Sequence, residues 1–193
     1  MMKTAVEAAM EYVQMLFRNN SGGHDADHTM RVYRNALLIA GREADCDIET
    51  VSLASLLHDA DDHKLFHTKD NANARSFLMR QNISPEKTER IIAAINSVSF
   101  SRNRGKQPET LEGKIVQDAD RLDAIGAIGI ARTFAYGSEH GRSLDSSIRH
   151  FHDKLLLLKD GMNTKTGREM AEERHAYIAD FLEEYRKETA ASS

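Results

Sequence analysis

Apolar and polar residues follow one another along most of this chain with the spacing of an amphipathic helix. In Ala5–Phe17, for example, apolar residues recur every three or four positions. Few segments alternate apolar and polar residues one by one, and the chain holds only two prolines and 11 glycines. The pattern therefore predicts an all-α fold.

The same spacing predicts eight helices. They are expected at about 5–17, 25–44, 47–58, 71–80, 84–98, 111–134, 144–159 and 166–185. Asp47 is a typical N-cap, and Ser84-Pro85 supplies an N-cap followed by a proline at the first helical position. Thr166 and Glu169 have the spacing of a capping box at the start of the last helix. A turn is expected at Asn19–Gly23, and a basic loop at Ser101–Lys106.

The length and composition of the chain favour a single domain. With 193 residues, of which 40% are hydrophobic, the chain can bury one core, so a single domain over 1–193 is expected. The net charge of -4 argues against a general binder of nucleic acids or membrane surfaces. Cys46 has no second cysteine to pair with, which fits a reducing compartment, and the cytoplasm is the default expectation. Neither a secretory signal nor a membrane-spanning segment is recognisable.

Histidine and aspartate side chains with apolar flanks stand out in three predicted helices and at the end of one of them. They are His28, the doublet His58-Asp59 and the aspartates within Gln117–Asp123. His58 shares a helix face with Leu57 and the apolar residues before it, so it is expected to point inward. Burying an imidazole beside a carboxylate is costly unless something binds them, and a metal ion is the simplest partner.

The aspartate that completes this set is not fixed by periodicity. Asp120 shares a face of small and apolar residues with Asp123 and Ala124, whereas Asp118 lies on a face with Ile115 and Leu122. Both faces suit packing against a neighbouring helix. Asp118 and Asp120 therefore both remain candidates at this point.

Imidazole and carboxylate ligands together suit a divalent ion such as Mn, Mg, Fe, Co or Ni, whereas structural zinc sites usually recruit thiolates. Such an ion would orient a phosphate, offset its charge and lower the pKa of water, which is hydrolytic chemistry. Each residue alone also has a plainer reading. His28 and Asp120 could be solvated, and His58-Asp59 could be a histidine at a helix C-terminus followed by a turn aspartate.

Three stretches resemble the HD-domain superfamily of metal-dependent phosphohydrolases, in particular its small stand-alone bacterial members. The stretches are His24-Asp-Ala-Asp-His-Thr-Met-Arg-Val-Tyr33, Leu56-Leu-His-Asp59 and Lys114-Ile-Val-Gln-Asp-Ala-Asp-Arg-Leu-Asp-Ala124. The resemblance covers about 23–137, with the predicted helices at about 144–185 beyond it. It implies that His28, His58, Asp59 and Asp120 are the metal ligands, which selects Asp120 over Asp118.

The resemblance also implies a role for Asp62. In relatives that hydrolyse guanosine tetraphosphate, an acidic pair shortly after the His-Asp doublet helps to activate water. Asp62 is the closest positional match here, while His63 departs from the acidic pattern and argues against that substrate. Asp62 is therefore expected to orient water or to act as general acid or base, although a surface acidic turn would look the same.

Basic residues near the predicted ligands are candidates for binding the phosphate. Arg31 lies one helical turn after His28, Lys64 follows the acidic turn, and Arg102, Arg104 and Lys106 precede the helix of Asp120. Each could instead be an ordinary solvated charge. Arg31 and Lys64 are preferred because they lie near ligands in the sequence.

The resemblance thus implies a metal-dependent phosphohydrolase that acts on a nucleotide or a related phosphate ester or anhydride, such as a nucleoside triphosphate pyrophosphohydrolase or a nucleotidase. The alternatives are a phosphodiesterase of cyclic or linear dinucleotides, and a regulatory module that keeps the metal site without turnover. The expected partner is a small phosphorylated molecule, with no nucleic acid and no membrane. The sequence allows a homo-oligomer without requiring one.

Overall fold

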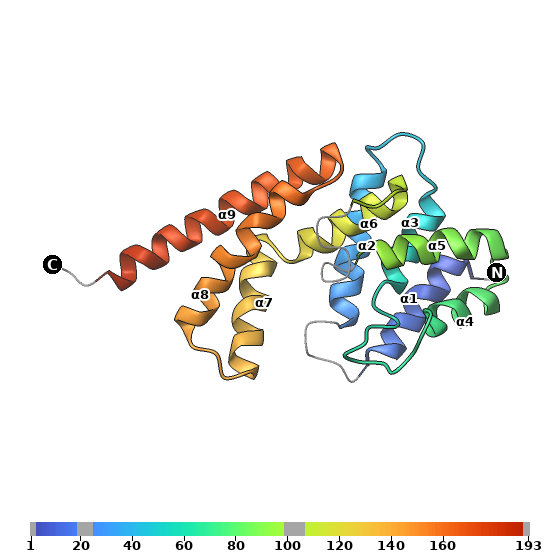
Figure 1. Ribbon diagram of the computed structural model, residues 1–193, viewed down its shortest axis with the longest axis horizontal. Helices are drawn as coiled ribbons and strands as arrows, with labels where there is room; N and C mark the ends of the chain where they lie inside the picture. Colours follow the sequence, from blue (N-terminus) through green and yellow to red (C-terminus); the bar gives the residue numbers. More distant parts are fainter. Residues whose placement is uncertain (1–2, 19–24, 99–106, 191–193) are drawn as a thin grey trace. The chain divides into compact units, whose positions relative to one another are not determined.

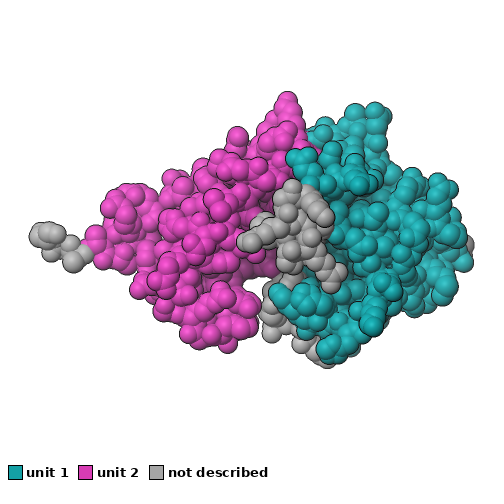
Figure 2. All heavy atoms as spheres, viewed as in Figure 1, with its two compact units in different colours: residues 1–120 teal, residues 121–193 magenta. Residues whose placement is uncertain are grey.

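The computed structural model describes residues 3–18, 25–98 and 107–190, and every regular element within them is helical (Figure 1). The predicted all-α fold is confirmed. These residues divide into two compact units, 1–120 and 121–193 (Figure 2). That the chain behaves as one domain stays a prediction. The predicted turn at Asn19–Gly23, His24 and the basic residues Arg102, Arg104 and Lys106 lie outside the described residues.

The first unit is built around its third helix. Its elements are α1 (Ala5–Leu16), α2 (Ala26–Ala40), α3 (Ile48–Leu57), α4 (Ala72–Arg80), α5 (Pro85–Val98) and the greater part of α6 (Leu111–Asp123). Helix α3 packs against α1, α2 and α5, and each of its residues from Thr50 to Leu57 is buried. A helix that is apolar all round belongs in a core, so α3 is the centre of this unit.

Polar side chains cap the helices of the first unit. Thr4 forms a capping box with Glu7 at the start of α1. The predicted N-cap Asp47 is confirmed, since its carboxylate accepts hydrogen bonds from the backbone N–H groups of Glu49 and Thr50, both at 3.1 Å. Helix α2 ends at Ala40, earlier than the expected Ala44, because Gly41 begins the turn that follows.

The single helix predicted over 111–134 is wrong. The chain turns after Asp123, and α7 (Gly126–Glu139) starts at a glycine whose φ of +75° is unfavourable for other residues. A side chain at Gly129 would meet the carbonyl oxygen of Ala124 at 2.3 Å, so Gly129 lets the backbone approach itself closely. Arg132 pairs with the buried Asp123 across this turn. Gly126 and Gly129 therefore permit the turn that separates α6 from α7.

The second unit holds α7, α8 (Leu144–Asp153), a 3-10 helix η1 (Leu155–Gly161) and α9 (Lys165–Thr189). An aromatic cluster joins α7, α8 and α9 through Phe134, the buried Phe151 and Phe181, whose ring centroids lie 5.9–6.0 Å apart. The helix predicted over 144–159 is broken at Lys154. The last helix is capped by Thr164 rather than Thr166, since the Thr164 hydroxyl accepts from the Gly167 N–H at 2.9 Å.

Within the described part of the chain, no helix combines the length and apolar character that crossing a bilayer requires.

Candidate metal centre

Helix α2 presents His28 from its first turn. Asp25 is the N-cap of this helix, and its carboxylate accepts a hydrogen bond from the His28 backbone N–H at 2.6 Å. A carboxylate at this position satisfies an otherwise unpaired donor and complements the helix dipole. The His28 side chain is only 3% exposed, so it points into the protein.

His58 comes from the C-terminal end of α3, where it is the C-cap residue. Its Nδ1 lies 2.8 Å from the carbonyl oxygen of Ser55, and its side chain is 2% exposed. Because a carbonyl oxygen can only accept, Nδ1 carries the proton, and in the neutral ring Nε2 offers a lone pair. That Nε2 faces Nε2 of His28 at 3.3 Å.

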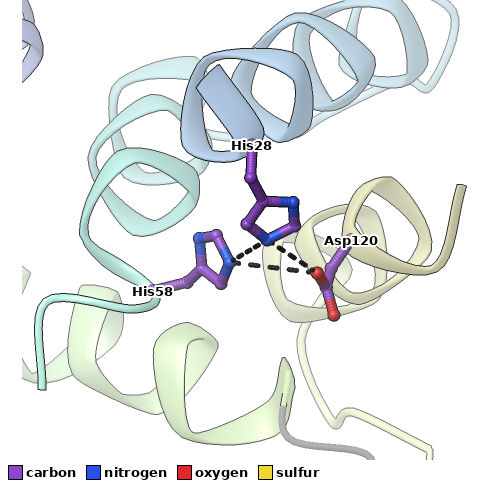
Figure 3. Close-up of side chains that lie close together, drawn as sticks. All are labelled: His28, His58 and Asp120. Carbon is purple, nitrogen blue, oxygen red and sulfur yellow. Dashed lines mark hydrogen bonds and ion pairs between the residues drawn. The ribbon is translucent and has the colours of Figure 1, made fainter. Parts of the chain in front are cut away.

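Two carboxylates complete the cluster. The Asp59 Oδ2 atom lies 3.5 Å from Nε2 of His28 and 3.3 Å from Nε2 of His58. The corresponding distances from Asp120 Oδ1 are 3.4 Å and 3.9 Å. Figure 3 shows His28, His58 and Asp120 pointing toward one another from α2, the end of α3 and α6.

These donors fit a divalent cation. An octahedral ion with bonds of about 2.1 Å holds neighbouring ligands about 3 Å apart, which is close to the separations here. One ligand atom from each of His28, His58 and Asp120 lies within 4.8 Å of the others. Two imidazole nitrogens and two carboxylate oxygens suit ions such as Mn, Mg or Fe, and the set contains no thiolate.

The electrostatics of the cluster also favour a cation. Burial lowers the pKa of the His58 imidazole, but the neighbouring Asp59 and Asp120 carboxylates and the Ser55 carbonyl outweigh burial and raise this pKa from 6.5 to about 9. Two carboxylates beside two imidazoles thus attract positive charge, which is either a proton on His58 or a metal ion. A metal ion binding there would have to displace that proton.

The cluster is not equally closed on all sides. The side chain of Asp120 is 31% exposed, whereas that of Asp59 is 11% exposed and the imidazoles are almost completely buried. The Asp120 carboxylate is therefore the most solvent-exposed group of the cluster.

The structure separates the two aspartates between which periodicity could not choose. Asp120 lies beside both imidazoles, while the side chain of Asp118 is completely buried within the first unit. Both faces of α6 are buried at this level, which explains why the apolar pattern was ambiguous. The geometry agrees with Asp120 as the ligand, and its role stays a prediction.

Asp61 and Asp62, in the acidic turn after His58-Asp59, make different contacts. Asp61 caps α4, since its oxygens accept from the backbone N–H groups of Asn73 at 2.9 Å and Ala74 at 3.0 Å. Asp62 accepts from the Lys64 backbone N–H at 2.8 Å through Oδ1, and its side chain is 16% exposed. Asp61 therefore stabilises the start of α4, whereas Asp62 contacts Lys64 and His63 of its own turn.

The predicted phosphate-binding residues lie at the surface or partly below it. Lys64 is exposed, and Arg31 is partly buried one turn after His28 on α2. Arg121, which follows Asp120, donates to the carbonyl oxygen of Gly161 and so has a structural contact in the second unit.

Two contributors were missed from the sequence. The Ser55 carbonyl that orients His58 belongs to the backbone, so no residue type announces it. Asn35 is buried and donates through Nδ2 to the carbonyl oxygen of Ala119 at 3.2 Å, next to Asp120. A polar residue on the inward face of α2 was a signal that the sequence did contain.

Comparison with known proteins agrees with this geometry. The model of a family described as HD domain matches residues 25–125. The chain is 41% identical over 191 residues to the uncharacterized protein YpgQ of Bacillus subtilis, covering 94% of this chain and 92% of that protein.

Solved structures resemble the chain over nearly its whole length. The crystal structure of Bacillus subtilis YpgQ in complex with ADP has a TM-score of 0.82 at 35% identity, with 97% of this chain and 96% of that one covered. An HD-superfamily hydrolase from Bacillus thuringiensis has a TM-score of 0.79 at 34% identity, with coverages of 96% and 97%.

Proposed function

The chain belongs to the HD-domain family, and from this membership we propose that it is a metal-dependent phosphohydrolase whose substrate is a nucleotide or a related phosphate ester or anhydride. The family is one of hydrolases whose domains bind divalent metals. The proposal concerns the bond that is cleaved, the kind of substrate and the residues that act on it.

One observation carries the proposal. The Nε2 atoms of His28 and His58 lie 3.3 Å apart, with an oxygen of Asp59 and an oxygen of Asp120 within 3.9 Å of them. Burying such a cluster without a cation is costly, so the burial of these side chains supports a bound ion. Asp120, the most exposed of the four residues, is where water and substrate would reach it.

The ligand bound to a relative favours a nucleotide as the substrate. The structure of Bacillus subtilis YpgQ is described as a complex with ADP. A nucleoside diphosphate group offers phosphate oxygens to a cation and to basic side chains, which is the chemistry that Arg31 and Lys64 would serve. We therefore place nucleoside di- and triphosphates first among the candidate substrates.

The ligands proposed for the ion are His28, His58, Asp59 and Asp120. A divalent cation, when bound, neutralises charge on phosphate oxygens and makes water more acidic. The Ser55 carbonyl keeps the His58 ring in the tautomer that leaves Nε2 free to bind. Asp62 would hold the attacking water or accept its proton, while Arg31 and Lys64 would stabilise the charge that develops on the phosphate oxygens.

The proposal is tested by a hydrolysis screen. Purified chain is stripped with a chelator, reloaded with Mn²⁺ or Mg²⁺, and incubated with nucleoside mono-, di- and triphosphates and with cyclic and linear dinucleotides. Chromatography of the products identifies the bond that is cleaved. Hydrolysis of a nucleotide that requires metal supports the proposal.

Two variants make the screen decisive. His58→Ala should lose the activity, whereas His152→Ala should keep it because His152 is exposed on α8. Cleavage of dinucleotides alone would identify a phosphodiesterase instead. Metal that raises the melting temperature while no phosphate is hydrolysed would identify a regulatory module and contradict the proposal.

A further inference from the structure

Helices α2 and α6, which carry His28 and Asp120, are joined by a buried hydrogen bond. Asn35 on α2 is 6% exposed, and its Nδ2 donates to the carbonyl oxygen of Ala119 on α6 at 3.2 Å. Asn35 lies seven residues after His28, and Ala119 immediately precedes Asp120. The bond thus links a side chain of α2 to the backbone of α6, and each of these helices carries a member of the cluster.

The spacing along α2 places Asn35 and His28 on the same side of the helix. Seven residues are about two turns, which leaves the two side chains only about 20° apart around the axis and about 10 Å apart along it. Both therefore face α6. The Asn35 amide would set the distance between the two helices. That distance would in turn place the His28 imidazole relative to Asp120.

We infer that Asn35 is a positioning residue, which sets the register between α2 and α6 so that Asp120 lies within coordination distance of an ion shared with His28. The inference rests on the proposed metal site and adds a residue that touches neither ion nor substrate. Register matters because a slip of α6 by one residue moves it about 1.5 Å, whereas metal–ligand distances tolerate only about 0.2 Å.

The partner of this bond makes it suited to the task. A side-chain amide fixes direction as well as distance, because its N–H must point at the carbonyl oxygen. The carbonyl of Ala119 belongs to the backbone of α6, so the bond holds the helix itself rather than a flexible side chain. Removing the amide would leave α6 packed by its apolar residues, which specify its position less narrowly.

Gln117 offers a matched control on the same helix. It is also buried, at 1% exposed, and its Nε2 donates to the carbonyl oxygen of Ser97 at 2.7 Å. This bond ties α6 to α5 (Pro85–Val98), which carries no proposed ligand. Loss of either bond should lower stability, but only the Asn35 bond joins two helices that carry ligands.

The test measures Mn²⁺ binding rather than activity. The wild-type chain, Asn35→Leu and Gln117→Met are stripped of metal and titrated with Mn²⁺ by calorimetry, and the urea midpoint of each metal-free chain is recorded. Asn35→Leu should weaken Mn²⁺ binding about tenfold, as loss of an outer-shell partner does, whereas Gln117→Met should stay within about twofold of wild type. If Asn35→Leu does not fold, Asn35→Ala removes the same donor without adding bulk.

Unchanged Mn²⁺ affinity in the Asn35 variant would overturn the inference. So would an equal loss in Gln117→Met, because the effect would then follow stability rather than register. A wild-type chain that binds no Mn²⁺ would remove the proposed metal site and this inference together. A wild-type chain that binds Mn²⁺ but hydrolyses no phosphate would remove the proposed function alone, and the Asn35 comparison would still decide the inference.

Discussion

The Nε2 atoms of His28 and His58 face each other at 3.3 Å. The Ser55 carbonyl, which pairs with Nδ1 of His58, orients the His58 ring for this contact. With Nδ1 of His58 committed to that carbonyl, the neutral ring turns a lone pair toward His28. Two nitrogen atoms at this distance need a proton or a cation between them, and the carboxylates of Asp59 and Asp120 favour either. This relationship underlies the account of the site.

Asp120 and Asp118 should differ in their effect on metal binding. Asp120→Asn should weaken Mn²⁺ binding by more than about 100-fold, because it removes a ligand rather than an outer-shell partner. Asp118→Asn should leave a bound ion in place, since Asp120 is the proposed ligand and its Oδ1 lies within 3.9 Å of both imidazole Nε2 atoms. Metal content after gel filtration measures both, and retention of metal by Asp120→Asn but not by Asp118→Asn would reverse the assignment.

Asp62 and Asp61 should separate catalysis from folding. Asp62→Asn should lower kcat by about 100-fold or more while Mn²⁺ still binds, because a proton acceptor is lost. Asp61→Asn should instead lower the free energy of unfolding by about 1 kcal/mol and leave kcat nearly unchanged, because Asp61 caps α4. Equal kcat values in the two variants would show that Asp62 takes no part in proton transfer.

The N-cap of α3 should make stability depend on pH. Burial raises the pKa of the Asp47 carboxyl, but hydrogen bonds from Thr50 and the ion pair with Lys87 outweigh burial and hold this pKa below its usual value of 3.8. A folded-state pKa that is lowered adds stability above the unfolded pKa, and this stability is lost as pH falls through the folded value.

Comparison of the wild-type chain with Asp47→Asn isolates this effect. The variant keeps a capping side chain but loses the charge. The wild type should be the more stable of the two near neutral pH, and the difference should shrink as pH falls from about 5 to about 3. Urea unfolding at several pH values measures it, and a difference that did not change with pH would contradict the role given to the Asp47 charge.

Gly129 should tolerate no side chain. A Cβ atom there would lie 2.3 Å from the carbonyl oxygen of Ala124, so Gly129→Ala should lower the free energy of unfolding by about 2 kcal/mol. Gly41→Ala is the control, because Gly41 has an ordinary φ of -67° and its nearest atom would be 3.3 Å away. If the urea midpoints of both variants fell by the same amount, the close approach of Gly129 to Ala124 would not explain the loss of stability.

Much of this fold could be predicted from the sequence, because amphipathic spacing and caps such as Asp47 act locally. The turn after Asp123 could not, since it depends on the positive φ of Gly126 and on the close approach of Gly129 to Ala124. Glycine in a helical pattern is compatible with both packing and a turn. Lys154, where α8 ends, likewise carries no local signal of a helix end.

The candidate site was predictable to a similar extent. His28, His58 and Asp59 were identifiable as candidate ligands because polar residues with apolar flanks are expected to be buried and then need a partner. The choice of Asp120 over Asp118 required the family resemblance, because both faces of α6 are buried. The Ser55 carbonyl and the Asn35 bond depend on how helices meet, which a single sequence does not specify.

The most direct measurement is an anomalous difference map from crystals of the chain grown with Mn²⁺. If the proposed site binds the ion, a peak is expected between about 2.0 and 2.4 Å from the Nε2 atoms of His28 and His58 and from carboxylate oxygens of Asp59 and Asp120. A peak elsewhere, or no peak while the two imidazoles still face each other, would contradict the proposed site.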